Sequence, residues 1–250
     1  MNDAELYLFD LQGFLVIENV LDAGELASLN QLFEARQLPE PNREGGTTSF
    51  GNFLTWGQPF CDLLDHPRLM PYLKVILGDG FRLDHYYGIY LRAGTGRLRL
   101  HGGNTPYDPP EYYHFRNGQM YNGLVVVGWN LTDTGPESGG FCCVPGSHKS
   151  NYPLPKAIAD AHYEAGCVVT PTVSAGSLVI FTEALTHGTA PWRADHERRS
   201  LLFKYSPAQQ SWAREHIKPP DGVELTPRQR LLFEPPYFNQ RASLFDPPEN

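Results

Sequence analysis

The sequence lacks the features of several common protein classes. Basic residues are outnumbered, with 20 Lys and Arg against 28 Asp and Glu in 250 residues, a formal net charge of −8. This balance argues against a nucleic-acid polymer as partner, because phosphate backbones need clustered cations. No stretch approaches the ~18 to 20 apolar residues that span a bilayer, and no early segment combines a basic start with a long apolar run. We therefore expect a cytoplasmic protein without a membrane partner.

Cysteine is also scarce. The four residues Cys61, Cys142, Cys143 and Cys167 have no spacing typical of a zinc ribbon or a disulfide framework. We interpret them as reduced, partly buried thiols, and the pair Cys142-Cys143 as apolar strand positions.

The order of expected elements predicts one domain over residues 1–250 with a mainly β fold and flanking helices (α+β). A strand is expected over 13–18, a helix over 23–36 with Asp22 and Glu25 as a capping box, a loop over 37–58 and a second helical region over 59–77. Short β-like runs separated by Gly, Pro and Asp then follow over 81–92, 97–101, 121–131, 140–144, 167–173, 177–182 and 198–205. This pattern is typical of a jelly roll, the double-stranded β-helix of cupin-like proteins, with the tail beyond Pro207 packed outside it.

Two histidines and an arginine are spaced as in mononuclear iron enzymes. Such enzymes hold Fe(II) on one face with two histidines and a carboxylate, usually in the form His-x-Asp followed by a distant His. Here His101-Gly102-Gly103 precedes His187 by 86 residues, and Arg198 follows 11 residues after His187. A guanidinium on the strand after His187 could bind the remote carboxyl of a dicarboxylate as a bidentate pair.

The chain resembles the phytanoyl-CoA dioxygenase family of Fe(II)/2-oxoglutarate enzymes over most of its length. The opening strand Gly13-Phe14-Leu15-Val16-Ile17 and the segment from Trp129-Asn130-Leu131-Thr132-Asp133 through Gly139-Gly140 to Pro145-Gly146-Ser147-His148-Lys149 carry the resemblance. It implies that His101 and His187 bind Fe(II), that Arg198 anchors 2-oxoglutarate, and that O2 is the oxidant. It also implies a contact of Trp129 with the co-substrate.

The chain departs from the family at Gly103, which stands where ordinary members have the carboxylate ligand. The motif resembles that of related radical halogenases, in which a residue without a side-chain oxygen leaves a coordination position for chloride. The preferred hypothesis is therefore a halogenase that chlorinates an aliphatic carbon of a small metabolite. The alternatives are a hydroxylase of the same family and a non-catalytic barrel that binds 2-oxoglutarate.

Several residues compete for the same roles. His114 is a second candidate for the proximal ligand, although Arg116 then occupies the carboxylate position. Asp108 or Glu183 could restore a carboxylate, but Asp108 precedes a proline and suits a turn, and Glu183 could instead contact a ligand from behind. His148 belongs to a turn-like segment and suits a structural role. If the strand parity shifts by one residue, Arg199 replaces Arg198, because neighbouring side chains face opposite ways.

Two further arginines bear on the substrate. In Arg97-Leu98-Arg99-Leu100-His101, strand alternation puts Arg97 and Arg99 on the face of His101, which predicts a small anionic substrate such as a nucleotide-like metabolite. The alternative is that a bulge breaks the register and both arginines pair with acidic surface residues. The sequence identifies neither the substrate nor the oligomeric state.

Overall fold

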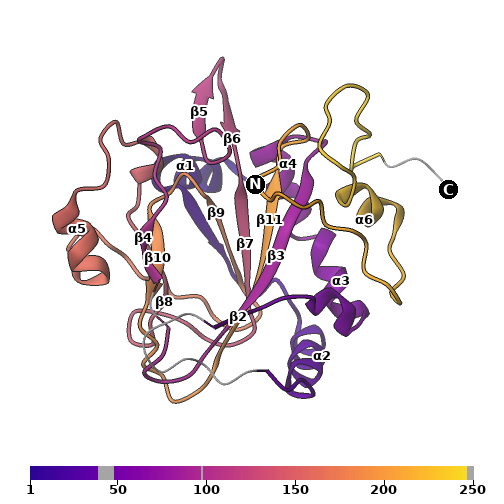
Figure 1. Ribbon diagram of the computed structural model, residues 1–250, viewed down its shortest axis with the longest axis horizontal. Coiled ribbons are helices and arrows are strands. Elements are labelled where there is room, and N and C mark those ends of the chain that lie inside the picture. The colour runs from indigo at the N-terminus through magenta and orange to yellow at the C-terminus, as the bar shows by residue number, and fades with distance from the viewer. Residues whose placement is uncertain (39–47, 97, 247–250) are drawn as a thin grey trace.

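Two antiparallel sheets form the centre of the molecule (Figure 1). The computed structural model describes residues 1–38, 48–96 and 98–246. The larger sheet has the order β1-β9-β7-β11-β3-β2 and the smaller one the order β4-β10-β8. Their strands are β1 (Phe14–Ile17), β2 (Thr48–Phe50), β3 (Arg82–Leu91), β4 (Leu98–His101), β7 (Val125–Asn130), β8 (Gly140–Cys143), β9 (Leu178–Thr182), β10 (His187–Ala190) and β11 (Arg198–Ser206).

Strand alternation gives the larger sheet two different apolar faces. Along β7, Val125, Val127 and Trp129 belong to one buried cluster, whereas Val126 belongs to another, as the period of two in a strand requires. The first cluster packs against the helices. The second lies between the two sheets, where Phe14, Ile89, Leu91, Val179 and Phe181 meet Cys143 of β8.

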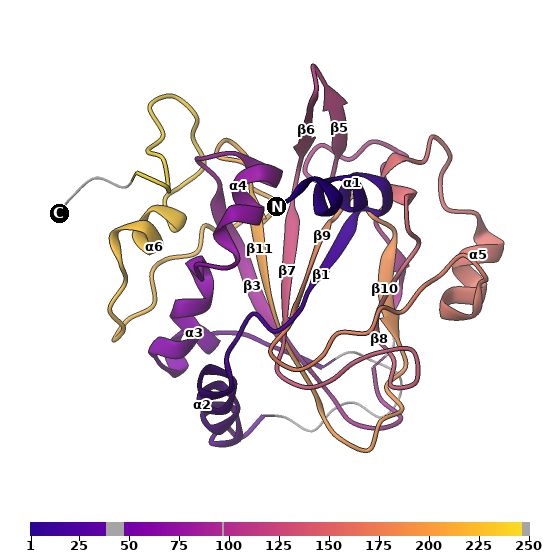
Figure 2. The same cartoon turned by 180° about the vertical axis from the view of Figure 1, so that it is seen from behind.

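Helices cover the outer face of the larger sheet, and Figure 2 shows α1 to α4 on that side. The helices are α1 (Asp3–Gln12), α2 (Ala23–Glu34), α3 (Gln58–Asp62), α4 (Met70–Leu77), α5 (Lys156–Ala161) and α6 (Pro227–Leu232), with 3-10 turns η1 (Phe53–Trp56), η2 (Leu63–Asp65), η3 (Ser147–Lys149) and η4 (His162–Glu164). The tail beyond Pro207 joins them, since Leu232 and Phe233 at the end of α6 belong to the outer cluster.

The predicted helix over 23–36 is confirmed as α2, with both hydrogen bonds of its capping box. The helical region over 59–77 is instead divided into α3, η2 and α4. His66 is extended, with ψ 131°, because a residue before proline avoids the helical region, and Pro67 follows it. None of the helices in the described part of the chain is long and apolar enough to cross a membrane.

Two β predictions and one loop prediction differ from the structure. The run 121–131 is divided at Gly123 between β6 (Gln119–Asn122) and β7, and β6 pairs with β5 (Tyr113–Arg116) in a projecting hairpin. The run 167–173 makes only isolated bridges, through Val169 and Val173. The predicted loop over 37–58 contains β2 and η1, while its residues 39–47 lie outside the described part.

Candidate active site

The register of the smaller sheet brings the two predicted histidine ligands together. His101 at the end of β4 is the pairing partner of His187 at the start of β10, and their ring centroids lie 4.2 Å apart. Gly102 makes this approach possible. A Cβ at that position, where φ is +74°, would lie 2.7 Å from the carbonyl oxygens of both Glu183 and Leu185, so the chain can turn here only with glycine.

Both imidazoles are oriented by backbone carbonyl groups. His187 Nδ1 lies 2.7 Å from the Leu185 carbonyl oxygen, and His101 Nδ1 lies 2.9 Å from the Arg99 carbonyl oxygen. A carbonyl can only accept, so Nδ1–H donates in each ring, and Nε2 keeps the lone pair that binds a metal. Burial lowers the pKa of His187 to about 4, although Glu183 opposes this shift. The ring is therefore neutral, the form that a metal ligand requires.

A carboxylate completes this group from the connection between β9 and β10. Glu183 Oε2 lies 3.8 Å from His187 Nε2, and its Oε1 lies 2.5 Å from Lys204 Nζ of β11. Burial opposes ionisation of Glu183, whose side chain is 3% exposed, but the Lys204 ammonium outweighs it and holds the pKa of Glu183 below its usual value. Candidate ligand atoms of His101, Glu183 and His187 all lie within 4.8 Å of one another, the one such group in the described residues.

The donor set fits a divalent iron. Two neutral imidazole nitrogens and one carboxylate oxygen are the ligands of the 2-His-1-carboxylate iron site, which leaves open positions for a bidentate 2-oxo acid and O2. Phe181 and Phe141 border His187, with ring centroids 4.7 Å and 6.3 Å away. These rings limit the access of water to one side of the site.

Arg198 provides a buried positive charge between the sheets. The residue is 4% exposed. Its Nε donates to Ser200 Oγ at 3.2 Å, and its Nη1 has no hydrogen-bond partner among the described residues. Burial lowers the pKa of Arg198 to about 10, so the group stays charged at neutral pH. A buried guanidinium with an unused donor is costly unless an anion occupies the space beside it, which fits a carboxylate of 2-oxoglutarate.

The parity of β11 distinguishes the two neighbouring arginines. Arg199 points to the other side of the sheet, where it pairs with Glu197 and Glu34 and lies over the Phe33 ring. Its charge is satisfied by these partners. Arg198 is therefore the arginine that faces the space between the sheets.

Trp129 does not lie with these residues. Its side chain is fully buried in the cluster beneath the helices, with an edge contact to His66 at 5.5 Å. The inward position of β7 belongs to Asn130, whose Oδ1 accepts a hydrogen bond from Ser200. The expected contact of Trp129 with the co-substrate is incompatible with this placement, because the sheet separates the two faces.

Neither of the two arginines predicted to bind substrate is placed at the site by the structure. A register irregularity interrupts the pairing of β4 with β10 between His187 and Thr189, and the Arg99 guanidinium is 78% exposed and lies 3.8 Å from Asp160 of α5. Arg99 therefore lies at the surface beside an acidic residue, as in the alternative interpretation of this strand. Arg97 lies outside the described residues.

The other candidates lie outside the group of ligands. His114 is exposed on β5 and stacks on Tyr107 and Tyr112. His148 is fully buried, where its Nε2 donates to the Asp10 carbonyl oxygen at 3.0 Å. Asp108 is exposed in the loop before β5. Of the two carboxylates weighed from the sequence, only Glu183 reaches the histidines.

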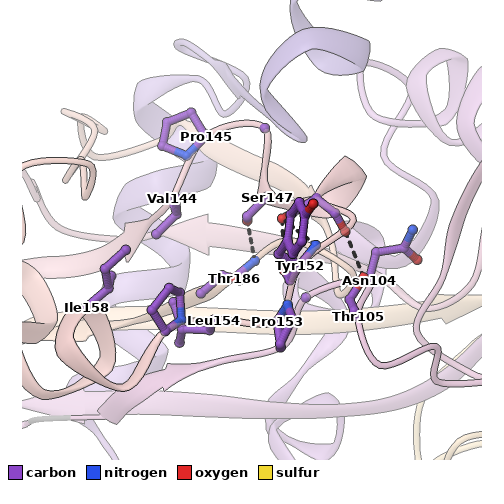
Figure 3. A pocket seen from close by; sticks show the side chains of 14 residues that line it. Asn104, Thr105, Val144, Pro145, Ser147, Tyr152, Pro153, Leu154, Ile158 and Thr186 are labelled. Atoms are coloured by element: carbon purple, nitrogen blue, oxygen red, sulfur yellow. Dashed lines mark hydrogen bonds between the residues drawn. The ribbon is translucent and has the colours of Figure 1, made fainter.

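Gly103 borders a cavity of about 340 Å³ between the histidine motif and the segment before α5 (Figure 3). A Cβ at Gly103, where φ is +115°, would have Thr186 Oγ1 at 3.2 Å as its one neighbour within 4 Å. Thr186 is held by a hydrogen bond from its N–H to Ser147 Oγ at 2.7 Å. No atom of His187 or Glu183 lies within 4 Å of that Cβ position, so this backbone directs residue 103 toward the cavity.

Comparisons with known proteins identify the family. The phytanoyl-CoA dioxygenase (PhyH) profile matches residues 9–200, while no curated protein matches the sequence. HygX from Streptomyces hygroscopicus, in a crystal structure with nickel and 2-oxoglutarate bound, aligns with a TM-score of 0.75 at 27% identity over 86% of this chain and 90% of HygX. Its iron-bound structure aligns with a TM-score of 0.72.

More distant structures share the fold. The non-haem α-ketoglutarate-dependent carbocyclase SnoK from nogalamycin biosynthesis aligns with a TM-score of 0.65 at 18% identity, over 90% of this chain and 94% of SnoK. The epimerase SnoN from the same biosynthesis aligns with a TM-score of 0.62, also at 18% identity and with the same coverage. These alignments confirm the double-stranded β-helix expected from the sequence. The chain therefore belongs to the phytanoyl-CoA dioxygenase family of Fe(II)/2-oxoglutarate-dependent enzymes.

Proposed function

We propose that this protein is an Fe(II)/2-oxoglutarate-dependent oxygenase that oxidises an aliphatic carbon of a small molecule. His101, Glu183 and His187 hold the iron, and Arg198 binds the remote carboxylate of 2-oxoglutarate. The observation that carries the proposal is the position of the Glu183 carboxylate beside both histidines. The structure of HygX with nickel, 2-oxoglutarate and hygromycin B bound supports a small-molecule substrate.

Each residue has a defined task in this proposal. The carbonyl groups of Arg99 and Leu185 fix the tautomers of the two imidazoles. Lys204 holds Glu183 ionised and limits its rotation, as partners of metal ligands commonly do. Ser200 positions the Arg198 guanidinium. When bound, Fe(II) and 2-oxoglutarate supply the oxidising chemistry with O2, and succinate and CO2 are the by-products.

The position of the anion site relative to the histidines supports the assignment of Arg198. Along β8, Cys143 pairs with His187 and Gly140 pairs with Ala190. A Cβ at Gly140 would lie 3.5 Å from Arg198 Nε, so the guanidinium lies beside that residue. Three residues of strand correspond to about 10 Å, a distance that a five-carbon dicarboxylate and its contacts to metal and guanidinium can bridge.

Chlorination is the second candidate function. Gly103 supplies no ligand oxygen, and the Glu183 carboxylate is already bonded to Lys204, which would leave one position on the iron for chloride. The presence of Glu183 among the ligand atoms favours oxygenation. A non-catalytic barrel would need neither a neutral His187 nor an ionised carboxylate at this position.

Substitution of Glu183 distinguishes the two chemistries. The native enzyme is first assayed for succinate formation with Fe(II), 2-oxoglutarate and a panel of small metabolites. Products formed at saturating chloride are then analysed by mass spectrometry. We expect a product that has gained oxygen or lost hydrogen without the chlorine isotope pattern. Glu183→Gln should lower Fe(II) affinity at least tenfold, as should His101→Ala and His187→Ala.

Asp108→Asn is the matched control, since Asp108 is an exposed carboxylate outside the group, and it should leave Fe(II) affinity unchanged. A chlorinated product from the native enzyme, lost in Gly103→Asp and kept in Glu183→Gln, would establish the halogenase instead. Native protein that binds 2-oxoglutarate but forms no succinate with any compound of the panel would favour the non-catalytic barrel.

A further inference from the structure

The loop before β5 is connected by hydrogen bonds to the segment that carries Glu183. The Glu183 N–H donates to the Leu124 carbonyl oxygen at 2.9 Å, and the Leu124 N–H donates to the Pro110 carbonyl oxygen at 2.8 Å. Two hydrogen bonds therefore connect the candidate ligand Glu183 to the residue preceding Glu111. The same Pro110 carbonyl oxygen accepts from Gln210 Nε2 at 2.8 Å, which brings the segment after β11 to this loop.

A buried carboxylate fixes the segment after β11 against β3. Asp84 is fully buried and accepts hydrogen bonds from Arg82, His85 and Ser206 and from the backbone N–H groups of Trp212 and Ala213, at 2.8 to 3.1 Å. Such a network of satisfied buried groups rigidifies its surroundings. The positions of His85 and Trp212 are thus set by one anchor.

Three rings form a stack between the surface and the proposed iron site. The His85 ring stacks on the Trp212 indole at 5.0 Å and 26° and on the Tyr87 ring at 6.3 Å and 13°. Tyr87 in turn lies 5.6 Å from Lys204 Nζ, the partner of Glu183. The outer end of the stack is accessible, because Trp212 is 50% exposed.

Glu111 is a further carboxylate near this group. It is half-buried, and the described cation that acts on it, Lys204, is bonded to Glu183. Burial, followed by the charges of Glu183 and Asp108, raises its pKa to about 7, with a smaller opposing contribution from a hydrogen bond to Trp212. Lys204 opposes the shift as well but is bonded to Glu183.

We propose that Glu111 and the stack of Trp212, His85 and Tyr87 bind an ammonium group of the substrate. This substrate-binding role rests on the proposed oxygenase function and specifies its substrate class, a small compound that bears an amine. The carboxylate of Glu111 pairs with the ammonium, and the indole face of Trp212 attracts the same charge, since cations are bound over aromatic rings within about 6 Å. The proposal replaces the expectation of an anionic substrate, because the Arg99 charge is directed to Asp160.

Two probes that differ by one group test the proposal. We would titrate trans-4-aminocyclohexanol and the uncharged trans-1,4-cyclohexanediol at pH 8 into the full-length protein. One series uses protein loaded anaerobically with Fe(II) and 2-oxoglutarate, and a parallel series uses metal-free protein. Binding is followed by tryptophan fluorescence, to which the half-exposed Trp212 contributes, and by calorimetry. We expect the amine to bind at least fivefold more tightly than the diol.

The variants assign this preference to its residues. Glu111→Gln should remove the difference between amine and diol, and Trp212→Phe should remove the fluorescence change while calorimetry still detects binding. Glu164→Gln, an exposed carboxylate near α5, is the control and should bind like the native protein. Equal affinity for both probes in the native protein, or an undiminished preference in Glu111→Gln, would overturn the proposal.

The two proposals fail separately. Discrimination that is present in metal-free protein and lost in Glu111→Gln supports the ammonium site even if Fe(II) and 2-oxoglutarate do not bind. Binding of Fe(II) and 2-oxoglutarate without discrimination between the probes overturns the ammonium site and leaves the oxygenase function intact.

Discussion

Removal of the Lys204 ammonium tests whether Glu183 is held ionised for a metal. Lys204→Met keeps the apolar stem and deletes the charge, so Glu183 loses its partner in a site where its side chain is 3% exposed. Loss of one member of a buried ion pair typically destabilises a protein by about 3 to 5 kcal/mol. We expect a loss of about that size in the free energy of unfolding of metal-free protein at pH 7, measured by urea denaturation.

The double variant Glu183→Gln/Lys204→Met should recover most of this loss, because replacement of both charges leaves no unpaired ion. Divalent iron should stabilise Lys204→Met more than it stabilises the native protein, since the metal supplies the missing positive charge. At a concentration of 100 times the dissociation constant, a metal that binds only the folded state contributes about 2.7 kcal/mol.

The pH dependence of Lys204→Met has a definite sign. Without the ammonium, burial raises the pKa of Glu183 above its unfolded value, so the variant is closest to native stability at low pH and loses stability as the pH rises. A loss below about 1 kcal/mol in Lys204→Met, or a double variant as unstable as the single one, would refute the reasoning.

Three further predictions concern other parts of the structure. Arg198→Gln should weaken 2-oxoglutarate binding roughly 30-fold, about 2 kcal/mol for a lost charged hydrogen-bond donor, measured by calorimetry, while Arg199→Gln should not. Gly102→Ala should lower the melting temperature and Fe(II) affinity together, because its Cβ would meet two carbonyl oxygens at 2.7 Å; a native melting curve would contradict this. His148 has a pKa lowered from 6.5 to about 4 by burial, so the neutral form is favoured in the fold. The contribution of His148 to the free energy of unfolding is complete above pH 6.5. It is lost as the pH falls toward 4, by up to ~3 kcal/mol. Urea denaturation at pH 7.5 and 4.5 should show a smaller pH dependence in His148→Asn, and an unchanged one would contradict this assignment.

The sequence predicted the strands that carry the candidate site but not every side-chain direction. The resemblance to the family selected Arg198 over Arg199, because strand alternation alone left the parity of β11 open. In the structure seven residues, Arg198 to Lys204, pair with β3 in continuous register and place the two side chains on opposite sides of the sheet. Strand alternation failed for Arg99 on β4, a strand of four residues with a register irregularity. On a short edge strand, one register irregularity is enough to invalidate a side-chain direction inferred from alternation. No residue of the Arg97–His101 motif indicates that irregularity.

The sequence left two roles open for Glu183, a metal ligand or a residue that contacts a ligand from behind. A carboxylate in the loop between two strands can point in many directions. Its separation of four residues from His187 was the available signal. The projecting hairpin also had a signal that went unused. Asn117-Gly118 is a two-residue turn in which both residues have positive φ, the type I′ turn that joins antiparallel strands. Trp212 and Glu111 could not be paired from sequence, since they are about 100 residues apart and meet through Asp84 and Pro110.

The edge position of β4 gives metal binding a mechanical role. Glu183 lies in the short connection that leads to His187 at the start of the central strand β10, whereas His101 comes from a strand at the edge of the order β4-β10-β8. An ion bound to all three residues would therefore fasten an edge strand to the rest of the barrel. We expect the backbone amides of residues 98–101 to exchange with deuterium faster when the ion is removed, with little change in the central strands. Metal occupancy and local strand order would then be linked, so the barrel would close fully only in its loaded form.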